Sequence, residues 1–172
     1  MLSWTNIDNR NAALASVVPI GLGLIQYNSL RPGQAGYTMF KTSAKPNWMN
    51  VSPSVFGFAD LLALSPLGYA SYLVYKYGGG FEYHDTSVAL ALYGTSIVFS
   101  GYCPPLHEHR EYRWLLINKT IGFLTGLGFT YAFYKIDERA GLLSVPYALL
   151  SAFCMYNYYK LFQMNDNKKE KL

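Results

Sequence analysis

Charged residues are scarce in this chain of 172 residues, at 14% of the sequence, whereas a soluble domain usually carries about 25%. Aromatic residues are abundant instead, at 17%, with 16 Tyr and 10 Phe. This balance excludes an ordinary soluble enzyme domain as the first expectation, and it also excludes a disordered chain. The mean hydropathy of +0.08 is modest, partly because Tyr scores as mildly polar although it belongs at membrane interfaces.

Sequence motifs of catalytic, metal-binding or cofactor-binding sites are also lacking. The two cysteines, Cys103 and Cys154, are too few for a disulfide framework or a metal signature, and we expect both to be buried. The net charge of +4 forms no basic stripe, which argues against nucleic-acid binding. No catalytic triad, phosphate loop or haem-attachment motif occurs, so we predict no catalytic residue, no metal and no cofactor. The first residues have no basic region followed by an apolar core, so no signal peptide is expected.

Five apolar segments are close to the roughly 20 residues that a helix needs to cross a bilayer. They run over about 12–30, 54–77, 87–103, 112–134 and 142–162. The third is expected to end at Pro104-Pro105, because two prolines in succession cannot continue a helix. We therefore predict an all-α integral membrane protein, a single domain built as a bundle of five transmembrane helices. A soluble bundle of unusually apolar helices is the alternative, disfavoured because these segments lack a clear polar face.

The connections between these segments are polar. Residues 31–53 form a long loop with several Pro and Gly, residues 107–113 a short charged loop, and residues 163–172 a charged tail. Five spans put the two termini on opposite sides of the membrane. The side of the tail carries nine Lys and Arg against four on the other side, which places the C-terminus in the cytosol by the positive-inside rule.

An ordered set of short motifs runs along the chain. It consists of Lys45-Pro46-Asn47-Trp48, Gly57 and Gly68 eleven residues apart, the run 67–74, Leu92-Tyr93 eleven residues before Pro104-Pro105, Trp114, Pro146-Tyr147, Ala152-Phe153 and Asn157-Tyr158. This set resembles the translocator protein (TspO/MBR) family over roughly residues 12–165. The resemblance implies a five-helix bundle, mostly in the mitochondrial outer membrane, often a homodimer, with a pocket for porphyrins and other lipophilic ligands and a sterol contact on the fifth span.

The resemblance also implies the residues of the two sites. Those expected to line the ligand pocket are Trp48, Phe56, Ala59, Asp60, Trp114 and Ile117, with the loop 31–53 covering the pocket and Trp48 as a lid contact. Those expected to contact sterol are Leu150, Tyr156, Tyr158, Tyr159 and Lys160, which include one match to a proposed cholesterol pattern. That pattern is weak, since Leu67, Tyr72 and Lys76 fit it as well. The alternative is an ordinary interfacial belt of tyrosines with a snorkelling lysine.

The chain departs from the family at informative positions. Asp60 replaces a family Trp that is linked to porphyrin chemistry, and Ser100, Gly101 and Cys103 replace an Asn and two Trp in the third span. We therefore expect binding, and with it transport, of a sterol or tetrapyrrole from the lipid bilayer rather than an enzyme. A membrane scaffold for partner proteins without a retained ligand is the alternative, and a porphyrin-degrading enzyme is the third.

Two charged residues lie inside the apolar segments. Asp60 and Lys119 each stand about six residues into a span from the same side, roughly 9 Å deep at 1.5 Å per residue. A charge at depth is costly unless it faces the bundle and is paired, so one hypothesis places both in the ligand pocket. The alternative is that Lys119 snorkels to the interface and that Asp60 is protonated or near the headgroups.

Two other patterns have simpler interpretations. Gly122 and Gly126 form a G-x-x-x-G pattern, which we expect to serve close packing within the bundle rather than a dimer contact. His107-Glu108-His109 does not match the helical H-E-x-x-H metal motif, so we expect it to be a solvated loop.

Overall fold

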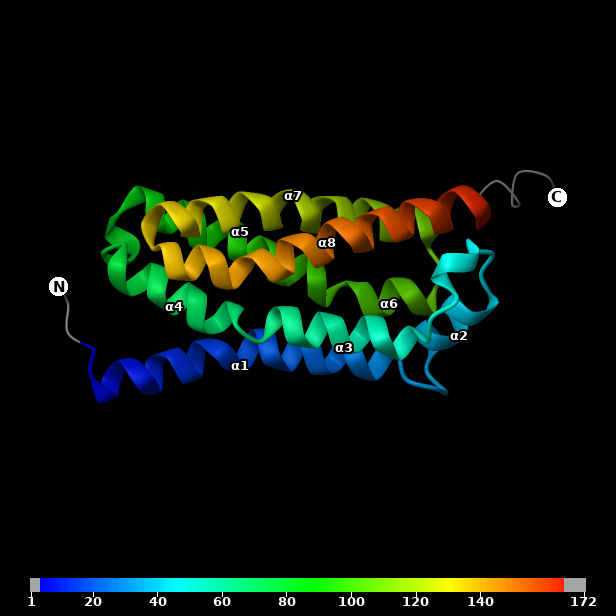
Figure 1. Ribbon diagram of the computed structural model, residues 1–172, viewed down its shortest axis with the longest axis horizontal. Helices are drawn as coiled ribbons and strands as arrows, with labels where there is room; N and C mark the ends of the chain where they lie inside the picture. Colours follow the sequence, from blue (N-terminus) through cyan, green and yellow to red (C-terminus); the bar gives the residue numbers. More distant parts are fainter. Residues whose placement is uncertain (1–3, 166–172) are drawn as a thin grey trace.

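The computed structural model describes residues 4–165, and in that part of the chain every regular element is a helix (Figure 1). The helices are α1 (Asn6–Ser29), α2 (Ala35–Thr42), η1 (Asn47–Met49), α3 (Pro53–Leu64), α4 (Leu67–Tyr77), η2 (Gly80–Glu82), α5 (His84–Gly101), α6 (Cys103–Glu108), α7 (Tyr112–Ile136) and α8 (Glu138–Asn165). The all-α prediction is confirmed, but these residues hold eight α-helices where five were expected.

Proline positions explain most of the difference in helix count. The predicted second span is divided at Ser65 and Pro66 into α3 and α4, because proline lacks the N–H that an uninterrupted helix needs. The third span, α5, ends at Gly101, close to the end expected at Pro104-Pro105. A new helix, α6, begins at Cys103 and holds both prolines in its first turn, where an N–H would have no helical partner anyway.

The long helices lie side by side along the long axis of the molecule, with the N-terminus at one end and α2 at the other (Figure 1). α7 and α8 form an antiparallel pair, α5 packs on α7, and α1 packs on both α3 and α4. The loop predicted over 31–53 contains α2 and η1, which lie across the end of the bundle where α3, α6 and the end of α8 meet (Figure 1).

Three helical stretches are by themselves long and apolar enough to cross a membrane: Asn6–Ser29, His84–Glu108 and Glu138–Asn165. α7 has 25 residues but carries three cations, Arg113, Lys119 and Lys135, while α3 and α4 are each too short alone. Large apolar side chains point outward along these helices, among them Leu124 and Leu149, which are 60% and 68% exposed. Exposed apolar side chains of this kind suit a lipid surrounding.

Close backbone approach holds α1 against α3 and α4. A Cβ atom at Gly68 would overlap the backbone of Ala15 and Ser16, and one at Gly57 would overlap the backbone of Tyr27. Small residues at helix contacts allow this proximity in membrane bundles, where packing rather than water exclusion drives association. The G-x-x-x-G pattern of Gly122 and Gly126 gives a less close helix contact. A Cβ at Gly122 would meet nothing within 4 Å, and one at Gly126 would meet the Tyr147 side chain at 3.1 Å.

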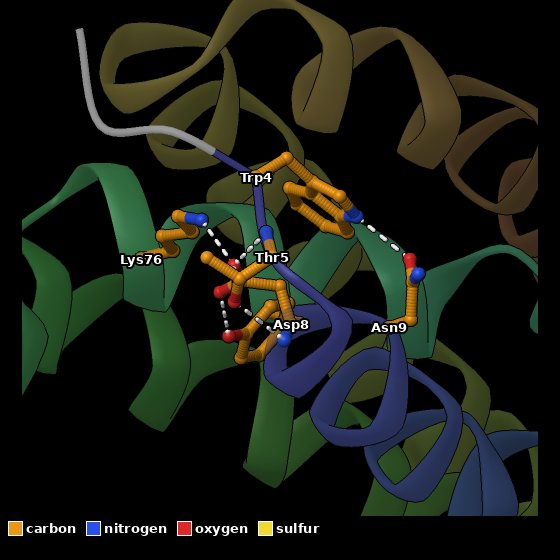
Figure 2. Close-up of polar contacts among 6 residues, drawn as sticks. Trp4, Thr5, Asp8, Asn9 and Lys76 are labelled. Atoms are coloured by element: carbon orange, nitrogen blue, oxygen red, sulfur yellow. Dashed lines mark hydrogen bonds and ion pairs between the residues drawn. The ribbon is translucent and has the colours of Figure 1, made fainter.

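A polar network fastens the N-terminal end of α1 to α4 (Figure 2). The side chain and backbone N–H of Thr5 pair with Asp8 in a capping box, which satisfies N–H groups that the first helical turn leaves without partners. Lys76 Nζ lies 2.7 Å from Asp8 Oδ2, and Tyr72 donates to Asp8 Oδ1 at 2.6 Å. This network ties the two helices together at the end of the bundle that lies away from α2.

Candidate ligand-binding site

Polar side chains from four helices meet inside the bundle around two adjoining cavities. Gln26 of α1, Asp60 of α3, Lys119 of α7 and Cys154 of α8 line both of them. Each cavity has a volume of about 20 Å³, which is room for roughly one water molecule. The interior therefore holds a polar centre surrounded by apolar helices, and this centre is closed in the present structure.

Asp60 and Lys119 are brought to the same cavities from helices far apart in the sequence, and both are half-buried. They do not form an ion pair, since Lys76–Asp8 is the pair found among residues 4–165. The Nζ of Lys119 instead lies 5.6 Å from the centre of the Tyr158 ring, within the range of a cation–π contact. The two opposite charges thus share one small polar space without touching.

The first cavity is bordered by a hydrogen-bonded group that joins α1, α5 and α8. Gln26 donates from Nε2 to the carbonyl oxygen of Ser100 at 3.1 Å, and the Tyr147 hydroxyl lies 2.7 Å from Ser96 Oγ and 3.1 Å from Ser100 Oγ. Hydrogen bonds of this kind satisfy polar groups that would otherwise be costly in an apolar bundle. They also hold the helices that form the cavity wall in register.

The second cavity lies beneath Phe40 and Phe56, whose rings stack with their centres 6.1 Å apart. His107 lines it and is 4% exposed, so the expectation that 107–109 is a solvated loop is wrong for this residue. The α6 turn points His107 inward, where Nε2 lies 2.6 Å from the Tyr158 hydroxyl. Asn157 also lines the cavity, and its buried Oδ1 has no hydrogen-bond partner among the described residues.

The segment covering this end is pinned by polar contacts at its edges. Ser43 Oγ lies 2.7 Å from the Tyr112 hydroxyl, and Ala44 exchanges two hydrogen bonds with the Asn165 side chain. Lys45 donates from Nζ to the carbonyl oxygen of Phe40 at 2.8 Å. Partial burial, with a smaller effect of the nearby Lys41, lowers the pKa of the Lys45 ammonium below its usual value. The cover is thus tied to both α7 and α8.

The predicted pocket residues fall into three groups. Phe56 and Asp60 line the inner cavities, and Ala59 is half-buried beside them without lining either one. Trp48 packs on the outside of α8, with its ring stacked on Tyr156 at 5.8 Å and with 47% of its surface exposed. Trp114 and Ile117 line a separate, outward-facing groove. The structure therefore does not bring all six residues into one pocket.

The predicted sterol-contact residues are divided between two sides of α8. Leu150 and Tyr158 point inward, since each lines one of the inner cavities. Tyr156 and Tyr159 point outward and are 47% and 43% exposed, and Lys160 lies over both of their rings. The helical period places residues two apart on different faces, so the five residues do not form one continuous surface.

Several residues that line the cavities were not predicted from the sequence. They are Gln26, Ser100, His107, Asn118, Tyr147, Ser151, Cys154 and Asn157. Gln26 and Asn118 carried a usable signal, because a polar side chain within an apolar segment is expected to face the bundle interior. Cys154 is buried as expected, but nothing in the sequence indicated that it or Tyr147 lines a cavity.

Comparison with known proteins matches this architecture to one family. The model of the TspO/MBR family matches residues 13–164. The chain belongs to the TspO/MBR family. It is 25% identical to the translocator protein of Sus scrofa over 98% of this chain and 91% of the relative. It is 31% identical to the translocator protein of Homo sapiens over 63% of this chain and 64% of the relative. Together with its long apolar helices, family membership makes the chain an integral membrane protein.

Within this TspO/MBR protein, the site departs from a purely apolar pocket. Its interior carries one acidic and one basic side chain together with several uncharged polar groups. A formally neutral but strongly polar centre suits a ligand group that can both donate and accept hydrogen bonds.

Proposed function

We propose that this protein binds, and by binding translocates, a hydrophobic ligand whose polar end reaches the Asp60–Lys119 centre. The observation that carries the proposal is that both charged residues line the same two enclosed cavities within an apolar bundle. Charges at such depth are expensive to maintain in a membrane protein, and they therefore mark functional sites. The relatives named translocator proteins support transport as the purpose of binding.

Binding requires the site to open. Two cavities of about 20 Å³ cannot hold a sterol or a tetrapyrrole, so the ligand must displace side chains at the covering end. Phe40 of the covering segment and Phe56 of α3 are the side chains to move, because both line the second cavity and their rings stack on each other. Release is then gated by the segment 31–53, and no covalent chemistry is involved.

The charge at Asp60 shapes ligand preference. An ionised carboxylate at position 60 offsets the attraction of Lys119 for the propionates of a porphyrin, so a neutral or cationic ligand is favoured relative to a site without Asp60. We therefore propose a sterol-like ligand ahead of a porphyrin, and we expect no porphyrin breakdown. Light- and oxygen-dependent loss of the Soret band of bound protoporphyrin IX would contradict that expectation.

The experiment uses a tryptophan reporter that lines the second cavity, beneath the covering segment. In a background with Trp4, Trp48 and Trp114 replaced by Phe, Phe56→Trp places the reporter at the cavity, and Leu124→Trp places the control reporter on the lipid-facing side of α7. The purified protein is titrated in detergent with protoporphyrin IX and with cholesterol. A saturable change at position 56 but not at position 124 supports the proposal, and its absence with both ligands overturns it.

A membrane scaffold for partner proteins is the second candidate, and the small size of the cavities favours it. It predicts no saturable ligand response together with retained folding and partner binding. We further propose, from family likeness, a homodimer in the mitochondrial outer membrane and, from the positive-inside rule, a C-terminus in the cytosol. Subcellular fractionation with protease protection of a C-terminal tag, and light scattering of the purified protein, test these three points.

A further inference from the structure

A second hollow lies on the outer surface of the bundle, between α5, α6 and α7. Six apolar or aromatic residues line it: Phe99, Tyr102, Leu106, Trp114, Ile117 and Ile121. Its volume of about 460 Å³ is far larger than that of either inner cavity. Tyr102 and Trp114 are 62% and 58% exposed, so this groove opens outward, toward the lipid that surrounds a membrane-spanning bundle.

Asn118 completes the lining of the groove and is 5% exposed. It also lines the first inner cavity, together with Asp60, so this one side chain borders both spaces. Its Oδ1 accepts a weak hydrogen bond from Cys103 Sγ at 3.4 Å, while its NH₂ group has no hydrogen-bond partner among residues 4–165. A side-chain amide has two donor hydrogens and two acceptor lone pairs, so one accepted bond leaves Asn118 able to donate and to accept at the same place.

We propose that this groove binds a neutral alcohol dissolved in the bilayer, a lipid whose only polar group is a hydroxyl, with that hydroxyl on Asn118. No charged residue lines the groove, so a charged headgroup would have no counter-charge there. A hydroxyl both donates and accepts, which matches the free capacity of the Asn118 amide. The site is separate from the inner cavities and would stand even if those bound nothing.

The depth of Asn118 agrees with this occupant. Trp114 lies near the start of α7, where an indole ring suits the membrane interface. Asn118 follows four residues later, roughly 6 Å further along the helix, close to where an amphiphile places its hydroxyl. Ile121 follows about one helical turn deeper and lines the groove where the apolar part of the lipid alcohol would lie.

The test reads Trp114 directly. In a variant carrying Trp4→Phe and Trp48→Phe, Trp114 is the remaining tryptophan, and its fluorescence is measured in nanodiscs containing increasing mole fractions of 9,10-dibromooctadecan-1-ol or its methyl ether. The bromines quench a nearby indole. We expect saturable quenching by the alcohol at about tenfold lower mole fraction than by the ether, the size of one good hydrogen bond.

Substitutions separate the hydroxyl contact from the apolar contact. Asn118→Leu should erase the preference for the alcohol, whereas Asn157→Leu, the same exchange at a buried asparagine that borders only an inner cavity, should keep it. Equal half-saturation for alcohol and ether in the parent variant, or a preference that survives Asn118→Leu in folded protein, overturns the proposal.

A second variant covers the case in which Asn118→Leu does not fold. Ile121→Phe narrows the groove along the path of the lipid chain, so half-saturation for both probes should move to a higher mole fraction, and unchanged quenching would overturn the proposal as well. The reporter at position 56 gives an independent reading, because it reports ligand in the inner cavities and not in this groove.

Discussion

Lys76 and Asp8 form an ion pair, with 2.7 Å between Nζ and Oδ2, which joins α4 to the first turn of α1 (Figure 2). The two side chains are only 10% and 11% exposed. The pair lies at the end of the bundle opposite α2, the helix that covers the cavities (Figure 1). The ion pair and the proposed ligand entry therefore lie at opposite ends of the same bundle, so the proposed opening would leave the joined end in place.

Removing the ammonium at position 76 should weaken the fixed end. In Lys76→Met, Asp8 loses its ion-pair partner while remaining largely shielded, so we expect the melting temperature in detergent to fall by about 2–4 °C. Lys135→Met is the control, because Lys135 is exposed near the end of α7 and contacts the Tyr131 ring. An equal shift in the two variants would show that the ion pair contributes nothing specific.

The close approach of α1 and α4 predicts strong sensitivity at one glycine. Gly68→Ala forces the two backbones apart, because its Cβ would overlap Ala15 and Ser16, and we expect a loss of about 1–3 kcal/mol in unfolding free energy. Gly94→Ala is the matched control on α5, where a Cβ meets nothing within 4 Å. Unfolding in mixed micelles measures both, and comparable stability would contradict the tight contact.

The hydrogen bond between His107 and Tyr158 predicts non-additive substitutions. His107→Phe and Tyr158→Phe each remove the same contact, which spans 2.6 Å, and each should cost about 1 kcal/mol. Because one bond is lost in every case, the double variant should be destabilised by less than the sum of the two single losses. A fully additive double variant would mean that the bond does not contribute.

Asp60 and Lys119 should also be coupled, although they do not touch. Replacing either one by Leu leaves the opposite charge without compensation in an apolar bundle, whereas replacing both removes the imbalance. We expect the double variant to be at least as stable as the less stable single variant. The stability of the parent protein, the two single variants and the double variant is measured by unfolding. Additive losses would show that each residue interacts only with its own surroundings and not with the other charge.

Asp60 also predicts a change in ligand selectivity. Asp60→Asn keeps the shape of the side chain and removes the negative charge, so binding of protoporphyrin IX at the position 56 reporter should tighten while binding of cholesterol stays unchanged. Phe58→Leu, on the exposed side of α3, is the control. Tight porphyrin binding that does not depend on Asp60 would contradict the electrostatic argument.

Sequence reasoning succeeded where a rule acts over a short stretch of chain. Apolar segments of sufficient length predicted helices and a membrane location, and both hold. At Pro104-Pro105 it predicted the end of α5 but not the start of α6, because a proline pair that stops one helix is compatible with the first turn of another. The sequence alone does not show whether the chain after the two prolines leaves the bundle or forms another helix. Packing of α6 on α2 and α7 decides that.

For the site, the sequence predicted how deep the charged residues lie in their helices, but it did not predict which way each side chain faces. Asp60 and Lys119 were predicted to lie at similar depth, and they line the same cavities. Trp114 was placed in the ligand pocket by the family resemblance, yet it faces outward. A uniformly apolar helix gives no amphipathic pattern from which to read its rotation.

The amino-acid sequence by itself determined the helical class, the membrane environment, the family and the presence of two charges within apolar segments. Only the tertiary structure decided which side chains face the interior, that His107 is buried, that the cavities are closed, and that Asn118 borders both the first cavity and an outer groove. The physical reason is that hydrophobicity and helix length act along the chain, whereas rotation about each helix axis is set by packing between helices that are distant in sequence.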